Sequence, residues 1–252
     1  MHISLFQAFL IGFLYFLIQS GTPWLTAFIA NYMRQPLVNG FIVGCILGDP
    51  IKGLIIGSAI NLPFIGVILV GGTMPTDSAL AGIVGTAFAL VTGVSPAVAV
   101  TIAVPVGLLG NFLLPVHMIK NSIFVHMMDK EAESGNIDKI TRLNVWLPQI
   151  TSAILFTVPC MLLIYFGVDV TASVLDQLTG IPLHTMEILG GVFPAVGIGL
   201  TLRLLLDKRE VVLFYLFGFL MVTYFELPML IVAVISFIIA YFYTDLKLGF
   251  NS

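Results

Sequence analysis

Residues 34–80 read RQPLVNGFIVGCILGDPIKGLIIGSAINLPFIGVILVGGTMPTDSAL, and the rest of the chain is organised around this stretch. It is apolar enough to lie in a membrane, but it is interrupted by Gly44, Gly48, Pro50, Gly53, Gly57, Pro63, Gly66, Gly71, Gly72 and Pro75. In lipid an unpaired backbone group costs several kcal/mol, so broken backbone survives only where protein or a water-filled cavity covers it. The stretch therefore predicts a place where a polar solute is held.

Composition places the whole chain in a membrane. Of 252 residues, 59% are hydrophobic and only 9% are charged, and the mean hydropathy is +1.09. A soluble domain carries roughly 25% charged residues, and a helix needs about 20 apolar residues to cross the hydrocarbon. We therefore expect an all-α polytopic membrane protein with roughly seven to nine transmembrane or re-entrant helices. The net charge of −3 provides no basic face for nucleic acid.

The chain divides into two apolar halves, residues 1–119 and 143–252, on either side of a polar segment, residues 120–142. We treat all 252 residues as one integral membrane domain. The polar segment carries four basic residues, Lys120, Lys130, Lys139 and Arg142. The positive-inside rule places it in the cytoplasm. It is interpreted as a solvated helical end, with contact to a soluble partner as the alternative.

Within the halves, turn residues divide the apolar chain into passes. Residues 78–116 contain no Asp, Glu, Lys or Arg and form two passes, separated at residues 93–96. Pro148 and Pro159 interrupt the pass over residues 143–168, and residues 226–228 form the turn of a final hairpin. Residues 188–202 are again broken by glycine and proline. Two such segments in corresponding halves indicate a possible inverted repeat with a transport site at the interface.

Polar residues inside the apolar segments are the candidate substrate-binding residues. Asn61 precedes Pro63, and its amide offers donors and an acceptor that match sugar hydroxyls; hydrogen bonding between helices is the alternative. Asn111 and Gln7 lie in similarly apolar passes, and Gly66 and Thr73 complete the set in the broken stretch. Asp77 is a further candidate, although Asp77 and Asp49 are equally suited to cap the helices that follow them.

Catalysis and metal binding find little support. The sequence contains no P-loop, no HExxH motif and no Ser, His and Asp set within one loop. His184 and Glu187 alone lack the remaining ligands of a metal site. Cys45 and Cys160 lie in separate apolar segments, which indicates neither a disulfide nor a metal motif. We expect no cofactor and no catalytic residue in this chain.

Several strings resemble the membrane subunit IIC of the mannose, fructose and sorbose family of bacterial sugar phosphotransferase systems. They are the Arg-Gln-Pro-Leu-Val of residues 34–38, the Val-Gly-Cys-Ile-Leu-Gly-Asp of residues 43–49, the Gly-Leu-Ile-Ile-Gly of residues 53–57, Asp77 to Ala81, the Ala-Val-Pro of residues 103–105, and the loop from Asp129 to Asn136. Weaker similarity reaches Gly190, Gly191 and residues 214–218. The resemblance covers nearly the whole chain.

The resemblance implies an inner-membrane subunit that binds a sugar and carries it across for phosphorylation by a IIB partner. It also implies a IID membrane subunit, a soluble IIA protein, and an elevator-type transporter built as a trimer of IIC–IID pairs and surrounded by lipid. Phosphoryl chemistry would lie on the partners, so this chain is expected to be a transport subunit and not an enzyme.

One departure from the family pattern concerns the substrate. Many members have Gly-Gly-Thr-Leu-Glu where this chain has Gly57-Ser58-Ala59-Ile60-Asn61, so an amide replaces a carboxylate. Charged acceptors form hydrogen bonds roughly twice as strong as neutral ones. We hypothesise that the loss of charge favours a sugar that carries an acidic group or lacks an amine.

Two other functions are compatible with the residues alone. Broken helices with embedded polar groups also occur in ion-gradient-driven secondary transporters, although no acidic residue lies at the centre of an unbroken pass here. A non-transporting assembly or docking subunit is the second alternative. It predicts that replacing Asn61, Asp77 or Asn111 disrupts the complex and leaves uptake intact.

Overall fold

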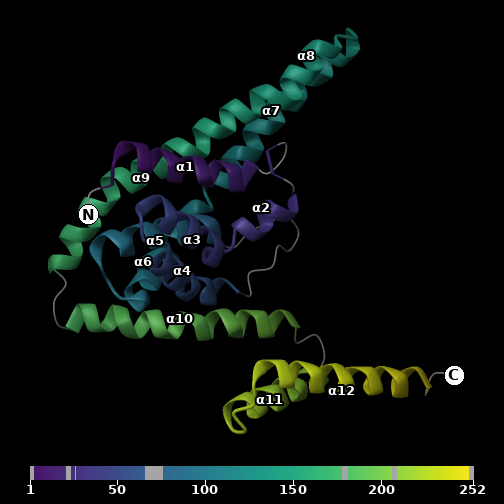
Figure 1. Ribbon diagram of the computed structural model, residues 1–252. Helices are drawn as coiled ribbons and strands as arrows, with labels where there is room; N and C mark the ends of the chain where they lie inside the picture. The colour runs from purple at the N-terminus through teal and green to yellow at the C-terminus, as the bar shows by residue number, and fades with distance from the viewer. Residues whose placement is uncertain are drawn as a thin grey trace. The chain divides into compact units, whose positions relative to one another are not determined.

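The computed structural model describes residues 3–20, 24–25, 27–65, 76–177, 181–205 and 209–249 (Figure 1). Every regular element in these ranges is helical. Contacts divide the chain into two units, residues 1–200 and 201–252, which we describe separately. The helices are α1 (Leu5–Ser20), α2 (Ala27–Met33), α3 (Pro36–Leu47), α4 (Pro50–Phe64), α5 (Ser78–Thr92), α6 (Pro96–Gly110), α7 (Leu113–Glu133), α8 (Ile137–Thr141), the π-helical turn η1 (Arg142–Trp146), α9 (Leu147–Gln177), α10 (Ile181–Leu205), α11 (Arg209–Thr223) and α12 (Met229–Gly249).

Helices α3 and α4 form a hairpin whose turn is specified by three adjacent residues. Gly48 ends α3 with φ of 93°, a left-handed conformation that glycine adopts without steric cost. Asp49 caps α4 by accepting a hydrogen bond from the Lys52 N–H at 3.1 Å. Pro50 then occupies the first helical position, where its missing N–H is harmless. The capping role predicted for Asp49 is confirmed.

Glycines allow the two arms of this hairpin to approach at backbone distance. A Cβ added at Gly53 would lie 2.6 Å from both the Gly40 carbonyl oxygen and the Gly44 Cα. A Cβ at Gly57 would lie 2.5 Å from the Pro36 carbonyl oxygen. Both helices therefore place small residues four apart on the shared face, the pattern by which membrane helices pack closely.

Helix α5 is the most enclosed part of the first unit, and α6 packs along it. All residues of α5 from Ala79 to Ala89 are buried, and a Cβ at Gly85 would lie 2.7 Å from the Ala103 side chain of α6. Gly93, with φ of 70°, ends α5, and Ser95 caps α6. The predicted break between two passes at residues 93–96 is confirmed.

Helices α1 and α9 pack against each other alongside the α3–α6 cluster. The Tyr15 ring of α1 meets the Phe156 ring of α9 edge to face, with centroids 5.5 Å apart. A Cβ at Gly12 would lie 2.6 Å from the Thr157 carbonyl oxygen. Helix α9 continues through Pro159, so the interruption expected at this residue is absent.

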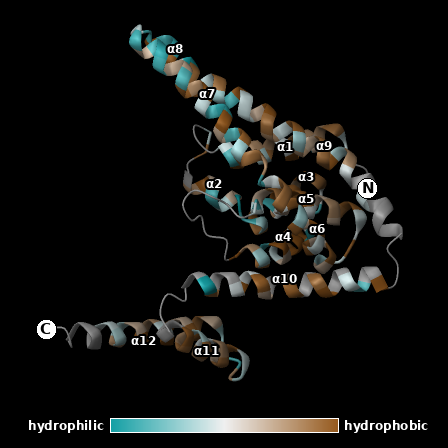
Figure 2. Ribbon diagram, turned by 180° about the vertical axis from the view of Figure 1, so that it is seen from behind, coloured by the Kyte–Doolittle hydropathy of each residue, from teal (hydrophilic) through white to brown (hydrophobic). Residues whose placement is uncertain are grey.

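Helices α7, α8 and α9 form a long hairpin whose tip is hydrophilic (Figure 2). Two helical stretches in the described residues, Pro96–Glu133 and Ile137–Gly167, are long and apolar enough to cross a membrane. In the second unit, α11 and α12 form the final hairpin, and Glu226 lies at its turn with φ of 52°. The turn predicted at residues 226–228 is confirmed.

Candidate functional site

Asp77 lies at the N-terminal end of α5, where its side chain has partners from two helices. Its Oδ1 accepts a hydrogen bond from the Leu80 N–H at 3.0 Å, so the predicted capping role is confirmed. Its Oδ2 accepts from the Tyr15 hydroxyl at 2.5 Å and from Gln19 Nε2 at 2.6 Å. The side chain is 3% exposed. Asp77 therefore joins the start of α5 to α1.

The contacts of Asp77 continue to the residues before α3. The Gln19 side-chain oxygen accepts a hydrogen bond from the Arg34 guanidinium at 2.8 Å. The Arg34 carbonyl oxygen in turn accepts from Asn39 Nδ2 and from the Ser78 hydroxyl, each at 3.3 Å. This Asp77 network joins α1, α3 and α5. Tyr15 and Gln19 were not predicted as site residues, although their spacing of four places both on one face of a helix.

Asn61 lies in the last turn of α4, shortly before Pro63. Its side-chain oxygen is buried and has no hydrogen-bond partner among the described residues. It follows Gly57 by four residues and so lies on the same face of α4, the face that packs on the start of α3. An unpaired buried acceptor costs about 1–3 kcal/mol, so this amide calls for a partner such as water or a solute.

Two further buried polar atoms in the same cluster of helices have no hydrogen-bond partner in the described part of the chain. They are the Asn39 side-chain oxygen on α3 and the Thr86 hydroxyl on α5. A Cβ at Gly40 of α3 would lie 2.9 Å from the Thr86 hydroxyl, and a Cβ at Gly82 of α5 would meet the Asn39 oxygen, so both groups lie at the contact between α3 and α5. Folded proteins leave few buried polar groups unpaired, so unpaired groups on α3, α4 and α5 mark this cluster as the candidate site.

Of the remaining predicted site residues, two lie in other contacts and two fall outside the described residues. Gln7 donates from Nε2 to the Ile46 carbonyl oxygen at 3.1 Å and so ties α1 to α3. Asn111 follows α6, next to Gly110, where a Cβ would lie 2.6 Å from the Asp77 Cβ. Gly66 and Thr73 fall within residues 66–75, which lie outside the described ranges.

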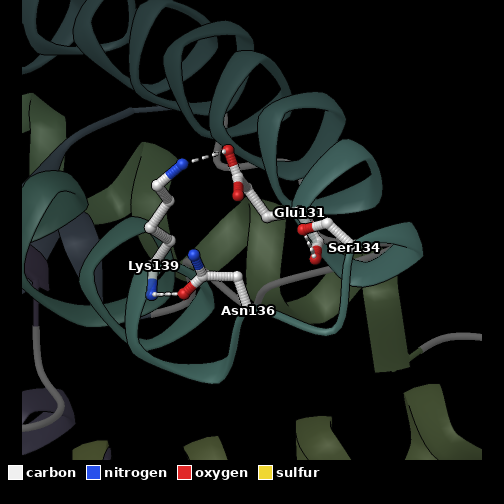
Figure 3. A network of polar contacts seen from close by, with 4 residues as sticks. All are labelled: Glu131, Ser134, Asn136 and Lys139. Atoms are coloured by element: carbon white, nitrogen blue, oxygen red, sulfur yellow. Dashed lines mark hydrogen bonds and ion pairs between the residues drawn. The ribbon is translucent and has the colours of Figure 1, made fainter.

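The polar segment 120–142 contains the helical tip of the α7–α9 hairpin (Figure 3). Asn136 caps α8 by accepting from the Lys139 N–H at 3.2 Å, and the Lys139 ammonium lies 3.2 Å from Glu131 Oε1. The Ser134 hydroxyl donates to the Glu131 carbonyl oxygen at 2.9 Å. These contacts agree with the predicted solvated helical end.

The described part of the chain brings no three His, Cys, Asp or Glu side chains together in a way that could hold a metal ion. Cys45 and Cys160 are free thiols, exposed and buried respectively. The candidate site is thus built from amides, hydroxyls and one buried carboxylate. Such groups suit the recognition of a hydroxyl-rich solute.

Comparison with known proteins agrees with this chemistry. The family model described as the PTS system sorbose-specific IIC component matches residues 5–242. The N-acetylgalactosamine permease IIC component 1 of Escherichia coli (strain K12) is 30% identical over 208 residues, which cover 82% of this chain and 76% of that protein.

Two solved structures share the fold over 100% of both chains. One is a membrane protein with a TM-score of 0.81 and 21% identity. The other is the mannose transporter ManYZ in complex with microcin E492, with a TM-score of 0.57 and 23% identity. Because the family model matches nearly the whole sequence, the chain belongs to the IIC family of phosphotransferase systems, the sugar-translocating subunits of the bacterial inner membrane, which leave phosphorylation to a IIB partner.

Proposed function

We propose that the α3–α6 cluster is the sugar-binding body of this subunit and that Asn61 bonds the sugar directly. The observation that carries the proposal is the buried, unpaired side-chain oxygen of Asn61. A sugar hydroxyl would satisfy this acceptor, while the amide N–H groups offer donors to a second hydroxyl. Asp77 caps the N-terminal end of α5, the helix that follows α4 in the chain. Its carboxylate is engaged by Tyr15 and Gln19, which supports a positioning role for it.

The substrate class follows from the neutral amide. A carboxylate at position 61 would favour an amine-bearing sugar through a charge-assisted hydrogen bond, and an amide removes that preference. We propose a sugar without a free amine, either neutral, N-acylated or acidic. The relative named as an N-acetylgalactosamine permease component supports this class, since an acetamido group carries no positive charge.

Transport is proposed to follow an elevator mechanism. The α3–α6 cluster would be the moving body, and α1 with α9 would form the fixed frame. Close glycine packing within α3 and α4 supports movement as one piece. The chain would act as one domain over residues 1–252, with residues 120–142 facing the cytoplasm. It would pair with a IID subunit in a trimer of such pairs, and the IIA and IIB proteins would transfer the phosphoryl group to the sugar.

Uptake into membrane vesicles tests the proposed function. Vesicles that contain this chain with its partner subunits would receive labelled hexoses, amino sugars, N-acetylated amino sugars and acidic sugars. We expect sugar phosphate to accumulate, to require phosphoenolpyruvate and to be insensitive to an uncoupler. Accumulation of free sugar that the uncoupler abolishes would identify a gradient-driven transporter instead. Preferential uptake of glucosamine would contradict the proposed substrate class.

The role of Asn61 is tested by Asn61→Leu, which keeps the side-chain size and removes both hydrogen-bonding functions. We expect the concentration of sugar at half-maximal uptake to rise about tenfold, because about 1.4 kcal/mol of binding is lost. Ser58→Ala, one turn earlier on α4, is the matched control, since its hydroxyl donates within the helix to the Ile55 carbonyl oxygen at 2.7 Å. Normal uptake by Asn61→Leu with a dissociated complex would favour the assembly-subunit alternative.

A further inference from the structure

A polar cavity separate from the Asn61 site lies between α7 and the start of α9. Its volume is about 430 Å³, and the C-terminal residue of α1, Ser20, also lines it. The wall contributed by α7 includes His117, Asn121 and Phe124, while Pro148 and Ser152 line it from α9. The cavity is large enough for the polar head of an amphiphile.

The hydrogen bonds around the cavity leave acceptors without donors. Asn121 Nδ2 lies 3.0 Å from His117 Nε2, while the Asn121 side-chain oxygen is buried and has no partner in the described chain. The Ser20 hydroxyl is likewise buried and unpaired among the described residues. The Asn121 oxygen requires a hydrogen-bond donor from a ligand, and the Ser20 hydroxyl can accept from a donor as well.

The backbone at the start of α9 adds a third acceptor. The π-helical turn η1 directs the Leu147 N–H to the Arg142 carbonyl oxygen, five residues back. In the same register the next bond would run from residue 148 to Leu143, but Pro148 has no N–H. The Leu143 carbonyl group therefore receives no helical hydrogen bond from residue 148. Leu143 also lines the cavity. Single π-helical turns of this kind are frequent at functional sites.

A cation lies beside these acceptors. The Lys120 ammonium donates to the Pro148 carbonyl oxygen at 3.1 Å and to the Ser152 hydroxyl. An ammonium has three N–H donors, so one remains for an anionic group such as a phosphate. The acceptors of the cavity thus have a cation close by, bonded to two lining residues, which matches a zwitterion whose cationic end donates hydrogen bonds.

The position of the chain's two tryptophans indicates the depth of the cavity in the membrane. Trp24 donates from Nε1 to Oε1 of Gln149, a lining residue, at 3.1 Å, and Trp146 belongs to η1. The two side chains are 53% and 58% exposed. Tryptophan is enriched at the level of lipid headgroups, and α7 becomes charged just beyond the cavity, from Asp129 to Glu131. The cavity therefore opens at headgroup depth.

We propose that this cavity binds the headgroup of a phospholipid that ends in a primary ammonium, such as phosphatidylethanolamine. The three ammonium N–H groups match the Asn121 side-chain oxygen, the Ser20 hydroxyl and the Leu143 carbonyl, and the phosphate faces Lys120. Both helices also expose apolar side chains elsewhere on their surfaces that suit contact with acyl chains, Ile119 and Ile123 on α7 and Ile150 and Ile154 on α9. This lipid site depends on membrane insertion alone and not on the identity of the sugar.

Native mass spectrometry of the purified IIC–IID complex tests the proposal. Phosphatidylethanolamine and phosphatidylcholine with identical acyl chains would be added in equal amounts. They carry the same charges, but choline has no N–H donor. We expect the ethanolamine lipid to be retained at least about fivefold more, the effect of one hydrogen bond. Equal retention of the two lipids would overturn the proposal. Retention of phosphatidylglycerol equal to that of phosphatidylethanolamine would overturn it as well.

Substitutions then locate the site. Asn121→Leu is expected to reduce the preference for ethanolamine over choline by about fivefold. Ser122→Ala, an exposed neighbour on the same helix, is the matched control and should leave the preference intact. An unchanged preference in Asn121→Leu would overturn the assignment to this cavity. If the variant fails to assemble, the comparison of phosphatidylethanolamine with phosphatidylcholine on the wild-type complex still decides the proposal. Sugar uptake is measured separately.

Discussion

Asp77 shows how one buried carboxylate can hold two helices together. Its two oxygens accept hydrogen bonds from the Tyr15 hydroxyl, Gln19 Nε2 and the Leu80 N–H. Both helix capping and packing between helices therefore depend on one side chain. This explains why an acidic residue is tolerated in an otherwise apolar environment, where unpaired charge is costly.

Asp77→Asn is expected to destabilise the folded protein by about 2 kcal/mol. The amide keeps one acceptor oxygen, so either the capping bond or the bonds to Tyr15 and Gln19 are lost. Tyr15→Phe removes a single partner and should cost about 1 kcal/mol. Thermal unfolding in detergent measures both, with Tyr165→Phe as the control, because that ring is 39% exposed. Equal stability of Asp77→Asn and wild type would show that the network contributes nothing.

At the scale of elements, the packing of α3 against α4 depends on the absence of side chains at the glycines of their shared face. The backbones come so close that no side chain larger than hydrogen fits at Gly53 or Gly57. In a membrane, where lipid is as apolar as the side chains, such close packing replaces the hydrophobic effect as the force between helices. The stability of this hairpin therefore depends on a few glycines.

Gly53→Ala is expected to destabilise the α3–α4 pair by about 2 kcal/mol, because the new Cβ would lie 2.6 Å from backbone atoms of α3. Gly199→Ala in α10 is the matched control, since no heavy atom lies within 4 Å of its added Cβ. In a helix interior that change should be neutral or stabilise by up to about 1 kcal/mol. Thermal unfolding of the two variants side by side gives the answer, and equal effects would argue against glycine-dependent packing.

The hairpin tip offers a local test of capping against charge pairing. Asn136→Ala removes the cap of α8 and should cost about 1 kcal/mol locally, so amide hydrogen exchange at Lys139 should accelerate about fivefold. Lys139→Met removes the pair with Glu131, in which the lysine side chain is 58% exposed, and should change exchange less than about twofold. Faster exchange in the lysine variant than in the asparagine variant would reverse this ranking.

At the scale of the whole molecule, the proposed transport motion concerns the first unit, where the Asp77 network and Gln7 join α1 to α3 and α5. The bond from Gln7 to the Ile46 carbonyl and the bonds from Tyr15 and Gln19 to Asp77 lie at this boundary. If the α3–α6 cluster slides against α1 and α9, these hydrogen bonds break and others form. The boundary is therefore where a covalent link should stop transport.

Cross-linking tests this motion in a background in which Cys45 and Cys160 are replaced by serine and alanine. A short reducible thiol cross-linker across Gln7→Cys and Ile46→Cys should abolish uptake, and reduction should restore it. A second pair, Trp24→Cys and Gln149→Cys, joins α9 of the proposed frame to a residue between α1 and α2, and the two side chains are already hydrogen-bonded at 3.1 Å. This second link should leave uptake largely intact. Full transport with the first link in place would exclude sliding between α1 and α3.

The sequence by itself determined those features that depend on residues within one helical turn. The Gly48-Asp49-Pro50 turn, the break at residues 93–96 and the turn at residues 226–228 follow from capping groups, proline geometry and glycine at positive φ. The apolar composition determined the helical class, because only helices and closed barrels satisfy backbone groups in lipid, and long apolar runs lack the alternation of barrel strands. Family membership followed from strings of the same local kind.

Only the tertiary structure decided which distant residues meet. Tyr15 lies 62 residues before Asp77, and nothing in the apolar run of α1 marks the face that turns toward α5. Helices that are apolar on all sides give no periodic signal for rotation or register, so the match of Gly40 and Gly44 with Gly53 and Gly57 also had to be seen in space. Helix rotation fixed which polar groups became paired and which, such as the Asn61 oxygen, have no partner among the described residues.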